Sequence, residues 1–382
     1  MLVRLFLTNT VSFFCNIIFY RIKKLKGYEM CTPLQPIAIR ENIFGDNIAS
    51  AEYWDFSQAN MNDTNRITVV TRVASICYQN PKVLENVENG IGSESLYNRL
   101  LAESHSLPSS SFEFVPVLLH HNEVLPLTDK VAYALNKDEV LESNYGISLD
   151  VVINTLEIEK YGCWIKHNNE TYLLTNYRAI VYDFEKYGDR GVDLRKRFNT
   201  EEECEIIKQY YQVFRFKVDM PTRSQMVRHR VHLQELSRRY VSGKRVAVDH
   251  YISDKMKDVV SKMTWTKVLQ EVPCGLNMND DLTGFAGAPI MGYISEEIPI
   301  NYTTQQVIDI CMNHYYQALE DGVKPQEARR IIPQTGYTEF WMGFLPFQLD
   351  NFFRLRDDSH AQWEVRQAAI AMKDMLGMPY EK

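Results

Sequence analysis

The sequence predicts an α+β fold with a central, mainly antiparallel sheet, flanking helices and a β-rich insertion. Short segments that are rich in β-branched residues, or that alternate apolar and polar residues, are typical of strands and fall between residues 66 and 220. Amphipathic segments with capping signals are typical of helices and dominate the chain after residue 300. A run of strands followed by a run of helices favours the α+β class.

The predicted strands follow one another through the first half of the chain. Residues 66–78 are rich in β-branched side chains and are predicted as a strand that could lead into a helix. Residues 107–119 are predicted as a turn and then a strand. Residues 147–158 and 170–184 are predicted as strands of the insertion, and residues 212–220 as a half-buried strand with alternating polarity.

The predicted helices carry clear start and stop signals. Ser93 is a plausible N-cap for residues 93–104, and Thr200 with Glu203 forms a capping-box pattern. Pro221 begins the helix that carries a basic cluster. Three further helices are predicted at residues 303–322, 325–333 and 350–377. The buried stripe of the first of these is predicted to consist of Val307, Ile310, Cys311, His314, Tyr315 and Leu319.

The domain organisation predicted from the 382 residues is an N-terminal extension at 1–62 and one domain at 63–382, interrupted by an insertion at about 118–208. Residues 1–29 contain an apolar run followed by basic residues. Three interpretations stay open for them: a membrane anchor, a core-packing extension, or sequence upstream of a start at Met30. The seven cysteines are scattered without a CxxC pair, which favours a reducing, intracellular compartment and no metal site.

Charge is unevenly distributed along the chain. The formal net charge is -7, which argues against a general nucleic-acid binder, yet residues 226–245 read "MVRHRVHLQELSRRYVSGKR". A local basic cluster on an acidic protein indicates a confined site for a small phosphorylated ligand. The alternative for such a cluster is a solvated basic surface.

The geometry of a helix limits how this cluster can act. On a continuous helix Arg228, His229 and Arg230 would fan over about 300° and could not share one ligand. They could converge if the helix ended there and the chain turned, gathering guanidinium and backbone N–H groups around an anion. In the last predicted helix Arg356, His360 and Glu364 would share one face, as a surface ladder or as part of a buried anion site.

Three motifs occur in a recognisable order: "QMVRHRVHLQELSRRYV", "EARRIIPQTGYTEFW" and "NFFRLRDDSHAQWEVRQAA". Together they resemble the flavin-dependent thymidylate synthases, whose signature is an RHR triplet, a short spacer and a Ser. The resemblance covers roughly residues 66–114 and 214–377. It implies a cytoplasmic homotetramer with sites at subunit interfaces. The implied enzyme methylates dUMP with methylenetetrahydrofolate and uses FAD reduced by NADPH. It implies no metal, no nucleic-acid partner and no membrane association.

The resemblance also assigns roles to individual residues. It implies that the dUMP ligands are Gln225, Arg228, Glu235, Ser237, Arg239, Arg329 and Arg356. It implies that the residues binding the flavin are Arg228, His229, Arg230, Glu235 and Asn351. Arg356 is the implied catalytic residue, because a fixed guanidinium beside the uracil lowers the free energy of negative charge on the ring. No protein nucleophile is required when the flavin supplies the hydride.

The chain departs from the family pattern at several positions. The spacer at 231–236 is one residue shorter, Phe114 stands where the family has a His, and Leu345 and Phe347 replace an amide and a guanidinium. These changes keep open a nucleotide-binding homologue that has lost flavin chemistry. A second alternative is a thymidylate synthase-like enzyme with Cys274 as nucleophile, and a third is a nucleic-acid binder that uses the basic cluster.

Overall fold

The structure, a computed structural model, describes residues 34–102, 108–126, 146–148, 157–188, 193–273 and 291–380. The chain divides into two compact units: unit 1 is Met1–Asp249 with Gly336–Lys382, and unit 2 is His250–Thr335. None of the helices in the described part combines the length and the apolar character needed to span a bilayer. The residues of the anchor alternative, 1–29, lie outside the described part, as does Cys274.

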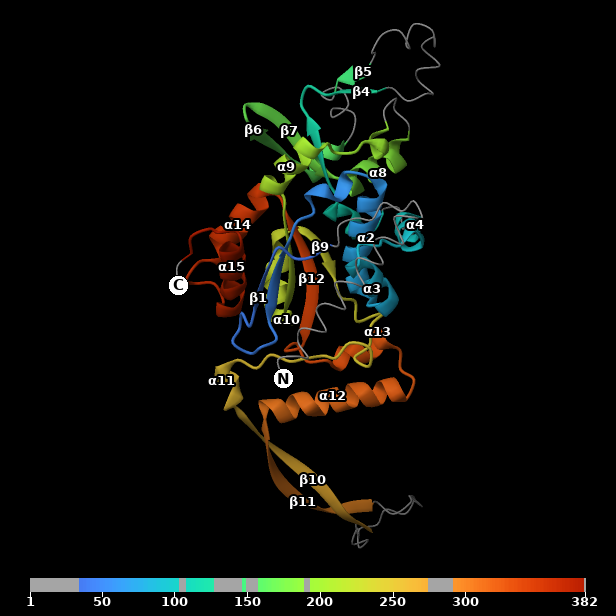
Figure 1. The fold of residues 1–382 in the computed structure, drawn as a ribbon. Coiled ribbons are helices and arrows are strands. Elements are labelled where there is room, and N and C mark those ends of the chain that lie inside the picture. Colours follow the sequence, from blue (N-terminus) through green and yellow to red (C-terminus); the bar gives the residue numbers. More distant parts are fainter. Residues whose placement is uncertain are drawn as a thin grey trace, which may run out of the picture. The chain divides into compact units, whose positions relative to one another are not determined.

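A five-stranded sheet lies at the centre of unit 1 (Figure 1). All of its neighbouring strands are antiparallel, in the order β1-β2-β8-β12-β9. The strands are β1 (Ala38–Glu41), β2 (Ser50–Trp54), β8 (Gln212–Asp219), β12 (Tyr337–Phe344) and β9 (His232–Glu235). The sheet confirms the predicted α+β fold, and β8 confirms the strand predicted at 212–220. Its first two strands come from residues predicted as an N-terminal extension.

Helices pack against the sheet from more than one side, and the sheet's side chains alternate to meet them. Trp341 of β12 contacts Trp54 and packs in the same core as residues of α2 (Asp63–Tyr78). The neighbouring Phe344 contacts Phe352 of α14 (Pro346–Arg356). The other helices in this part of unit 1 are α3 (Pro81–Glu88), α4 (Glu94–Ala102), α10 (Met220–Met226) and α15 (Trp363–Met375). Ser93 caps α4 as predicted, since its Oγ accepts from the Leu96 N–H.

The prediction of a strand at residues 66–78 is wrong, because these residues belong to α2. Asn62 caps the helix through its Oδ1, which accepts from the Asn65 N–H at 2.8 Å. Its buried residues run from Arg66 to Ile76 almost without interruption. A helix that is buried on nearly every side lacks the 3.6-residue pattern that identifies amphipathic helices, so β-branched composition misled the prediction.

Residues 118–208 hold small sheets and also helices. β3 (Pro116–His120), β7 (Glu170–Asn176) and β6 (Cys163–His167) form one antiparallel sheet, and β4 (Val124–Pro126) pairs with β5 (Gly146–Ser148). The helical segments nearby are η2 (Ser110–Phe114), η3 (Glu157–Tyr161), α8 (Tyr177–Tyr187), η4 (Leu194–Lys196) and α9 (Glu201–Tyr210). The strand predicted at 170–184 is therefore correct only as far as Asn176, whose Oδ1 accepts from the Ala179 N–H and caps α8. Most of the strand predicted at 147–158 lies outside the described residues.

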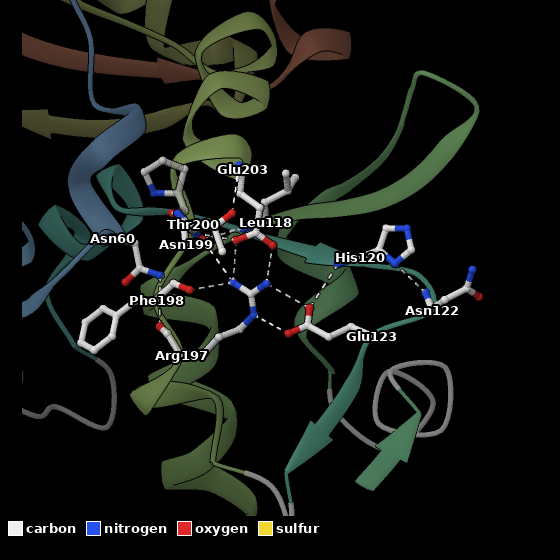
Figure 2. A network of polar contacts seen from close by, with 11 residues as sticks. Asn60, Leu118, His120, Asn122, Glu123, Arg197, Phe198, Asn199, Thr200 and Glu203 are labelled. Atoms are coloured by element: carbon white, nitrogen blue, oxygen red, sulfur yellow. Dashed lines mark hydrogen bonds and ion pairs between the residues drawn. The ribbon is translucent and has the colours of Figure 1, made fainter. Parts of the chain in front are cut away.

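A polar network fixes this region internally (Figure 2). Arg197 donates from Nε to Glu123 at 2.7 Å and from Nη2 to Glu203 at 2.5 Å. Glu203 also closes the predicted capping box with Thr200 at the start of α9. Burial alone lowers the pKa of Arg197, but the hydrogen bonds to the two carboxylates outweigh burial and raise its pKa overall.

Unit 2 contains a long antiparallel hairpin and several helices. The hairpin strands are β10 (Val260–Pro273) and β11 (Met291–Thr303). The helices are α11 (Asp254–Lys257), α12 (Thr304–Glu320), α13 (Pro325–Ala328) and the short turn η6 (Arg329–Ile331). The predicted helix at 303–322 is confirmed as α12, but its predicted stripe is wrong in part. Val307 and Ile310 are 40% and 50% exposed, whereas Ile308 and Met312 are buried beside Tyr315. The apolar residues of this helix lie on more than one of its faces, so their periodicity did not identify the buried face.

Candidate functional site

The basic cluster starts in a short helix that ends in a sharp turn. α10 runs directly into the 3-10 turn η5 (Val227–His229), and Arg230 then adopts a left-handed conformation with φ +53°. A non-glycine residue in this region costs about 1–2 kcal/mol, so the turn needs support from elsewhere. Gln348 provides it, because its Nε2 donates to the Arg230 carbonyl at 3.0 Å. The helix thus ends within the Arg-His-Arg triplet, which is the condition for its side chains to converge.

The single helix predicted at 350–377 is wrong. α14 ends at Arg356 and α15 begins at Trp363, so Arg356, His360 and Glu364 do not share a helix face. The Asp358 carboxylate accepts from the His360 backbone N–H at 2.7 Å, which is the local bonding by which Asp competes with helix formation. The preceding Asp357 accepts from Lys373 of α15 at 2.5 Å. The break directs Arg356 to a different set of partners.

Arg356 contacts the turn that ends α10. Its Nε donates to Nε2 of His229 at 2.8 Å, and its Nη2 donates to the Gln225 carbonyl oxygen at 3.1 Å. A weaker contact of 3.4 Å joins Nη1 to the Gln225 side-chain oxygen. The His229 ring packs edge-on against Phe352, with ring centroids 4.9 Å apart. Segments about 130 residues apart in the chain thus meet in one cluster, defined here as Gln225, Arg228, His229 and Arg356.

His229 acts in this cluster as a neutral acceptor. A guanidinium can only donate, so the Nε2 atom that faces Arg356 carries no proton. Burial and then the charge of Arg356 lower the pKa of His229 to about 4. The imidazole therefore stays neutral at physiological pH and orients the guanidinium without neutralising it.

The positive charge of this cluster has no protein counter-charge in the described part of the chain. No carboxylate there forms an ion pair with Arg356 or with Arg228, which is exposed. Burial and then the charge of Arg228 lower the pKa of Arg356, yet a guanidinium remains protonated in proteins. Asn351 lies on the same helix and accepts from Arg354 at 2.8 Å. Two neighbouring cations without an anion form a site that an anionic ligand would stabilise.

Glu235 at the end of β9 is already paired. Arg223 of α10 donates from Nη2 to one of its carboxylate oxygens, and Thr338 donates to the other at 3.2 Å. The Cys77 thiol donates to the Glu235 carbonyl, and Gln234 Nε2 donates to the Cys77 sulfur, both at 2.9 Å. Burial raises the pKa of Cys77 to about 11, so it is a structural thiol, though in a helix and not the predicted strand. Arg223 and Cys77 were missed as supports of this strand, since nothing in the sequence pairs them with Glu235.

The remaining predicted residues form no hydrogen bond or ion pair with this cluster among the described residues. The carbonyl of Ser237 accepts from the Tyr240 N–H at 3.0 Å in the turn after β9, and Arg239 is exposed with its guanidinium 5.4 Å from the centre of the Tyr240 ring. No hydrogen bond or ion pair between described residues joins Ser237 or Arg239 to Arg356. Arg329 belongs to unit 2, where η6 presents it to solvent. The described residues also contain no group of three or more His, Cys, Asp or Glu that could hold a metal ion.

The positions that depart from the family pattern lie near a pocket of about 250 Å³. Phe114 is fully buried and its ring meets His232 edge-on at 6.2 Å, so it is a core residue. Leu345 and Phe347 line the pocket, and Phe347 is 57% exposed. Residues of the predicted insertion also line the pocket, among them Arg178. The resemblance singled out Arg230, Leu345 and Phe347 of this lining, whereas the lining residues of the predicted insertion belong to no motif that would indicate a pocket.

An antiparallel α+β fold that gathers uncompensated guanidinium groups beside a neutral imidazole has the chemistry of an anion-binding site. Comparison with known proteins identifies the family to which this anion-binding fold is similar. The family model described as "Thymidylate synthase complementing protein" matches residues 189–378. Over these residues the chain belongs to that family, as the resemblance of the three motifs predicts.

Individual relatives match shorter parts of the chain. A flavin-dependent thymidylate synthase from Kosmotoga olearia is 29% identical over 163 residues, which is 42% of this chain and 60% of the relative. One from Thermosipho africanus is 40% identical over 62 residues, or 16% of this chain and 27% of the relative. A solved UMP/dUMP methylase from Streptomyces cacaoi with bound 5-Br UMP is 20% identical. That match covers 44% of this chain and 69% of that one, with a TM-score of 0.28. The chain thus spans between about a quarter and three fifths of these two curated relatives.

Proposed function

We propose that the protein is a flavin-dependent thymidylate synthase that methylates dUMP to dTMP. Methylenetetrahydrofolate would be the carbon donor and NADPH the reductant, in the cytoplasm. The observation that carries this proposal is the position of Arg356, a half-buried guanidinium held by Gln225 and neutral His229 and left without a described carboxylate. The family match over residues 189–378 and the names of the curated relatives support it.

Arg356 would act on the pyrimidine ring of dUMP. Carbon 5 of uracil becomes nucleophilic only as negative charge builds on the ring, and a fixed guanidinium beside the ring stabilises that charge. Each unit by which the ring pKa falls corresponds to about 1.4 kcal/mol. His229 keeps the guanidinium oriented because it accepts a hydrogen bond without competing for the positive charge.

The other nucleotide ligands would be Gln225, Arg228, Glu235, Ser237, Arg239 and Arg329. Within one chain, no described contact joins Ser237 or Arg239 to Arg356, so one protomer does not show a complete nucleotide site. The assembly that the resemblance to the family implies is a homotetramer, in which neighbouring subunits would complete each site. Arg223 would fix the Glu235 carboxylate before the nucleotide binds.

The residues present fit a flavin cofactor. Arg228 and Arg230 are both exposed without a described counter-charge, on either side of the point where the chain turns, so both suit the pyrophosphate of FAD. Neutral His229 and Asn351 offer uncharged polar contacts. When bound, FAD would supply the hydride that reduces the transferred carbon to a methyl group.

Purified protein tests the proposal directly. With dUMP, methylenetetrahydrofolate, NADPH and FAD, we expect production of dTMP and a flavin absorption spectrum in the protein fraction. A protein that binds dUMP but takes up no FAD and makes no dTMP would instead be a nucleotide-binding homologue without flavin chemistry. A protein that binds neither ligand would contradict both functions.

A further inference from the structure

Gln225 of α10 is contacted by residues at both ends of the turn that separates α14 from α15. Arg356, the last residue of α14, donates from Nη1 to the Gln225 side-chain oxygen at 3.4 Å and from Nη2 to the Gln225 carbonyl at 3.1 Å. Gln362, which precedes the first residue of α15, accepts through its Oε1 from Nε2 of Gln225. The two ends of one turn therefore hold the backbone of this glutamine and both ends of its amide.

Local hydrogen bonds fix the turn itself. The Asp358 carboxylate accepts from the His360 backbone N–H at 2.7 Å, and the Asp358 carbonyl accepts from the Ala361 N–H at 3.0 Å. Asp is well suited to such bonding because its short side chain reaches backbone N–H groups nearby in the chain. The positions of Arg356 and Gln362 are thereby set relative to each other.

Gln362 occupies the N-cap position of α15 without acting as a capping residue. An N-cap side chain ordinarily accepts from a backbone N–H of the first turn, whereas the side chain of Gln362 makes no such bond among the described residues. Its Nε2 donates instead to the carboxylate of Glu364 at 2.9 Å, while its Oε1 faces Gln225. The side chain thus connects α15 to α10, which helix capping does not require.

The hydrogen bonds from Arg356 to Glu364 form a chain whose direction is fixed at both ends. A guanidinium can only donate, so Arg356 requires the oxygen of the Gln225 amide. An ionised carboxylate can only accept, so Glu364 requires the nitrogen of the Gln362 amide. These two requirements leave the nitrogen of Gln225 opposite the oxygen of Gln362, and that pairing completes the chain. Donors and acceptors therefore alternate along it without a mismatch.

This chain determines which atoms of Gln225 a ligand can meet. A flipped amide would set its N–H groups against the guanidinium of Arg356 and its oxygen against the oxygen of Gln362. In the observed orientation Gln362 accepts from one of the two N–H donors on Nε2, so the described contacts leave the other N–H for a further acceptor. We infer that Gln362 and Glu364 are positioning residues, which fix the Gln225 amide so that it donates to an oxygen of the bound pyrimidine nucleotide. This inference rests on the proposed function, in which Gln225 is a ligand of dUMP.

Calorimetric titration of the full-length protein with dUMP tests the inference, and steady-state kinetics of dTMP formation are measured beside it. Gln362→Leu removes both amide contacts at similar side-chain size. Glu364→Gln is nearly isosteric, but an amide both donates and accepts and so no longer fixes the direction of the chain. Gln305→Leu is the matched control for the first variant, because Gln305 is an exposed glutamine whose Nε2 also donates to a carboxylate, that of Asp309 at 2.8 Å. Glu94→Gln is the control for the second, since Glu94 is an exposed carboxylate in the first turn of α4.

Gln362→Leu should weaken dUMP binding about three- to tenfold, as expected for one neutral hydrogen bond. Glu364→Gln should weaken it about threefold, because only the orientation of the amides is loosened. In both variants the KM for dUMP should rise with kcat nearly unchanged, which is the sign of a lost binding contact. The two controls should change dUMP affinity less than about 1.5-fold, as for surface substitutions elsewhere.

Dependence on Gln225 separates positioning from a purely structural role. In a Gln225→Leu background, a further Gln362→Leu should change dUMP affinity less than about 1.5-fold, because the amide on which it acts is gone. Glu364→Gln gives the same comparison if Gln362→Leu does not fold. If these variants bind dUMP like the wild type, or weaken binding equally with and without Gln225, the inference is wrong and the proposed function still stands. A wild-type protein that binds no dUMP would contradict the proposed function, and the inference with it.

Discussion

Arg197 and Arg356 are both drawn out of full solvent, but their surroundings differ in kind. Arg197 lies between the carboxylates of Glu123 and Glu203, and its pKa is raised (Figure 2). The Arg356 side chain donates to a neutral imidazole and to Gln225, and its pKa is lowered by burial and by Arg228. The first guanidinium is satisfied by the fold itself, while the second lacks a counter-charge in the described part of the chain.

The difference is the one expected between an arginine kept for structure and an arginine kept for function. Removing charge from water has a free-energy cost, which a paired arginine offsets through its ion pairs. An arginine held in place without an anion retains that cost in the folded protein. Such an arginine is expected at a position where the residue is kept for function and not for stability.

The largest effect is expected from Arg356→Ala. Loss of the guanidinium should lower the rate of dTMP formation by at least about 1,000-fold, because charge on the pyrimidine loses its stabilising partner. Reduction of the bound flavin by NADPH should remain largely intact. The measurement is dTMP production beside stopped-flow flavin reduction, with exposed Arg99 changed to Ala as control. An equal loss in both reactions would remove the proposed role of Arg356 at the pyrimidine.

Replacing both arginines by Met compares their contributions to stability. Arg197→Met should lower the free energy of unfolding by about 3 kcal/mol, because it leaves two partly buried carboxylates unpaired. Arg356→Met should leave stability unchanged or raise it slightly, since it removes an uncompensated charge. Urea unfolding of the two variants measures the contrast. Equal destabilisation by both substitutions would show that the two arginines do not differ as described.

Arg329→Ala tests whether an arginine of unit 2 contributes to dUMP binding. If Arg329 is a phosphate ligand in the assembled protein, its loss should weaken dUMP binding by about 10- to 100-fold, as for a charge-assisted hydrogen bond. Arg330→Ala is the matched control, because Arg330 forms a 3.1 Å ion pair with Glu327 and is 78% exposed. Calorimetric titration with dUMP measures both. An unchanged affinity in Arg329→Ala would exclude that residue from the site.

The sequence predicted the fold where local signals agree with tertiary packing. A capping box located α9, an amphipathic pattern located α12, and alternation located β8. The wrong strand at 66–78 and the wrong buried stripe of α12 share a cause. In both segments, tertiary packing determines which residues are buried. Burial on many sides removes the periodicity on which such predictions depend.

The candidate site was predicted residue by residue through its resemblance to a family, but its geometry was not. The sequence could state that the Arg-His-Arg triplet must leave the helix in order to converge, and the turn at Arg230 fulfils that condition. It could not show that the helix ends at Arg356. Because of that helix end, Arg356 contacts His229 and does not share a helix face with His360 and Glu364. Contacts between segments more than a hundred residues apart leave no periodic signal in either segment.

The smallest expected effect concerns the pH dependence that His229 adds to stability. Its pKa is about 4 in the folded protein and ordinarily 6.5, so the unfolded chain binds the proton first as the pH falls. The free energy of unfolding should therefore be insensitive to His229 above about pH 6.5 and should decrease from there towards about pH 4. Urea unfolding of wild type and His229→Gln at several pH values isolates this part, with exposed His360→Gln as control. The wild type should lose more stability than His229→Gln over this interval.

The same protonation would remove the acceptor that orients Arg356, so dTMP formation should fail at the acid end of the range. If His229→Gln and wild type lose stability in parallel, the imidazole is not held neutral beside the arginine.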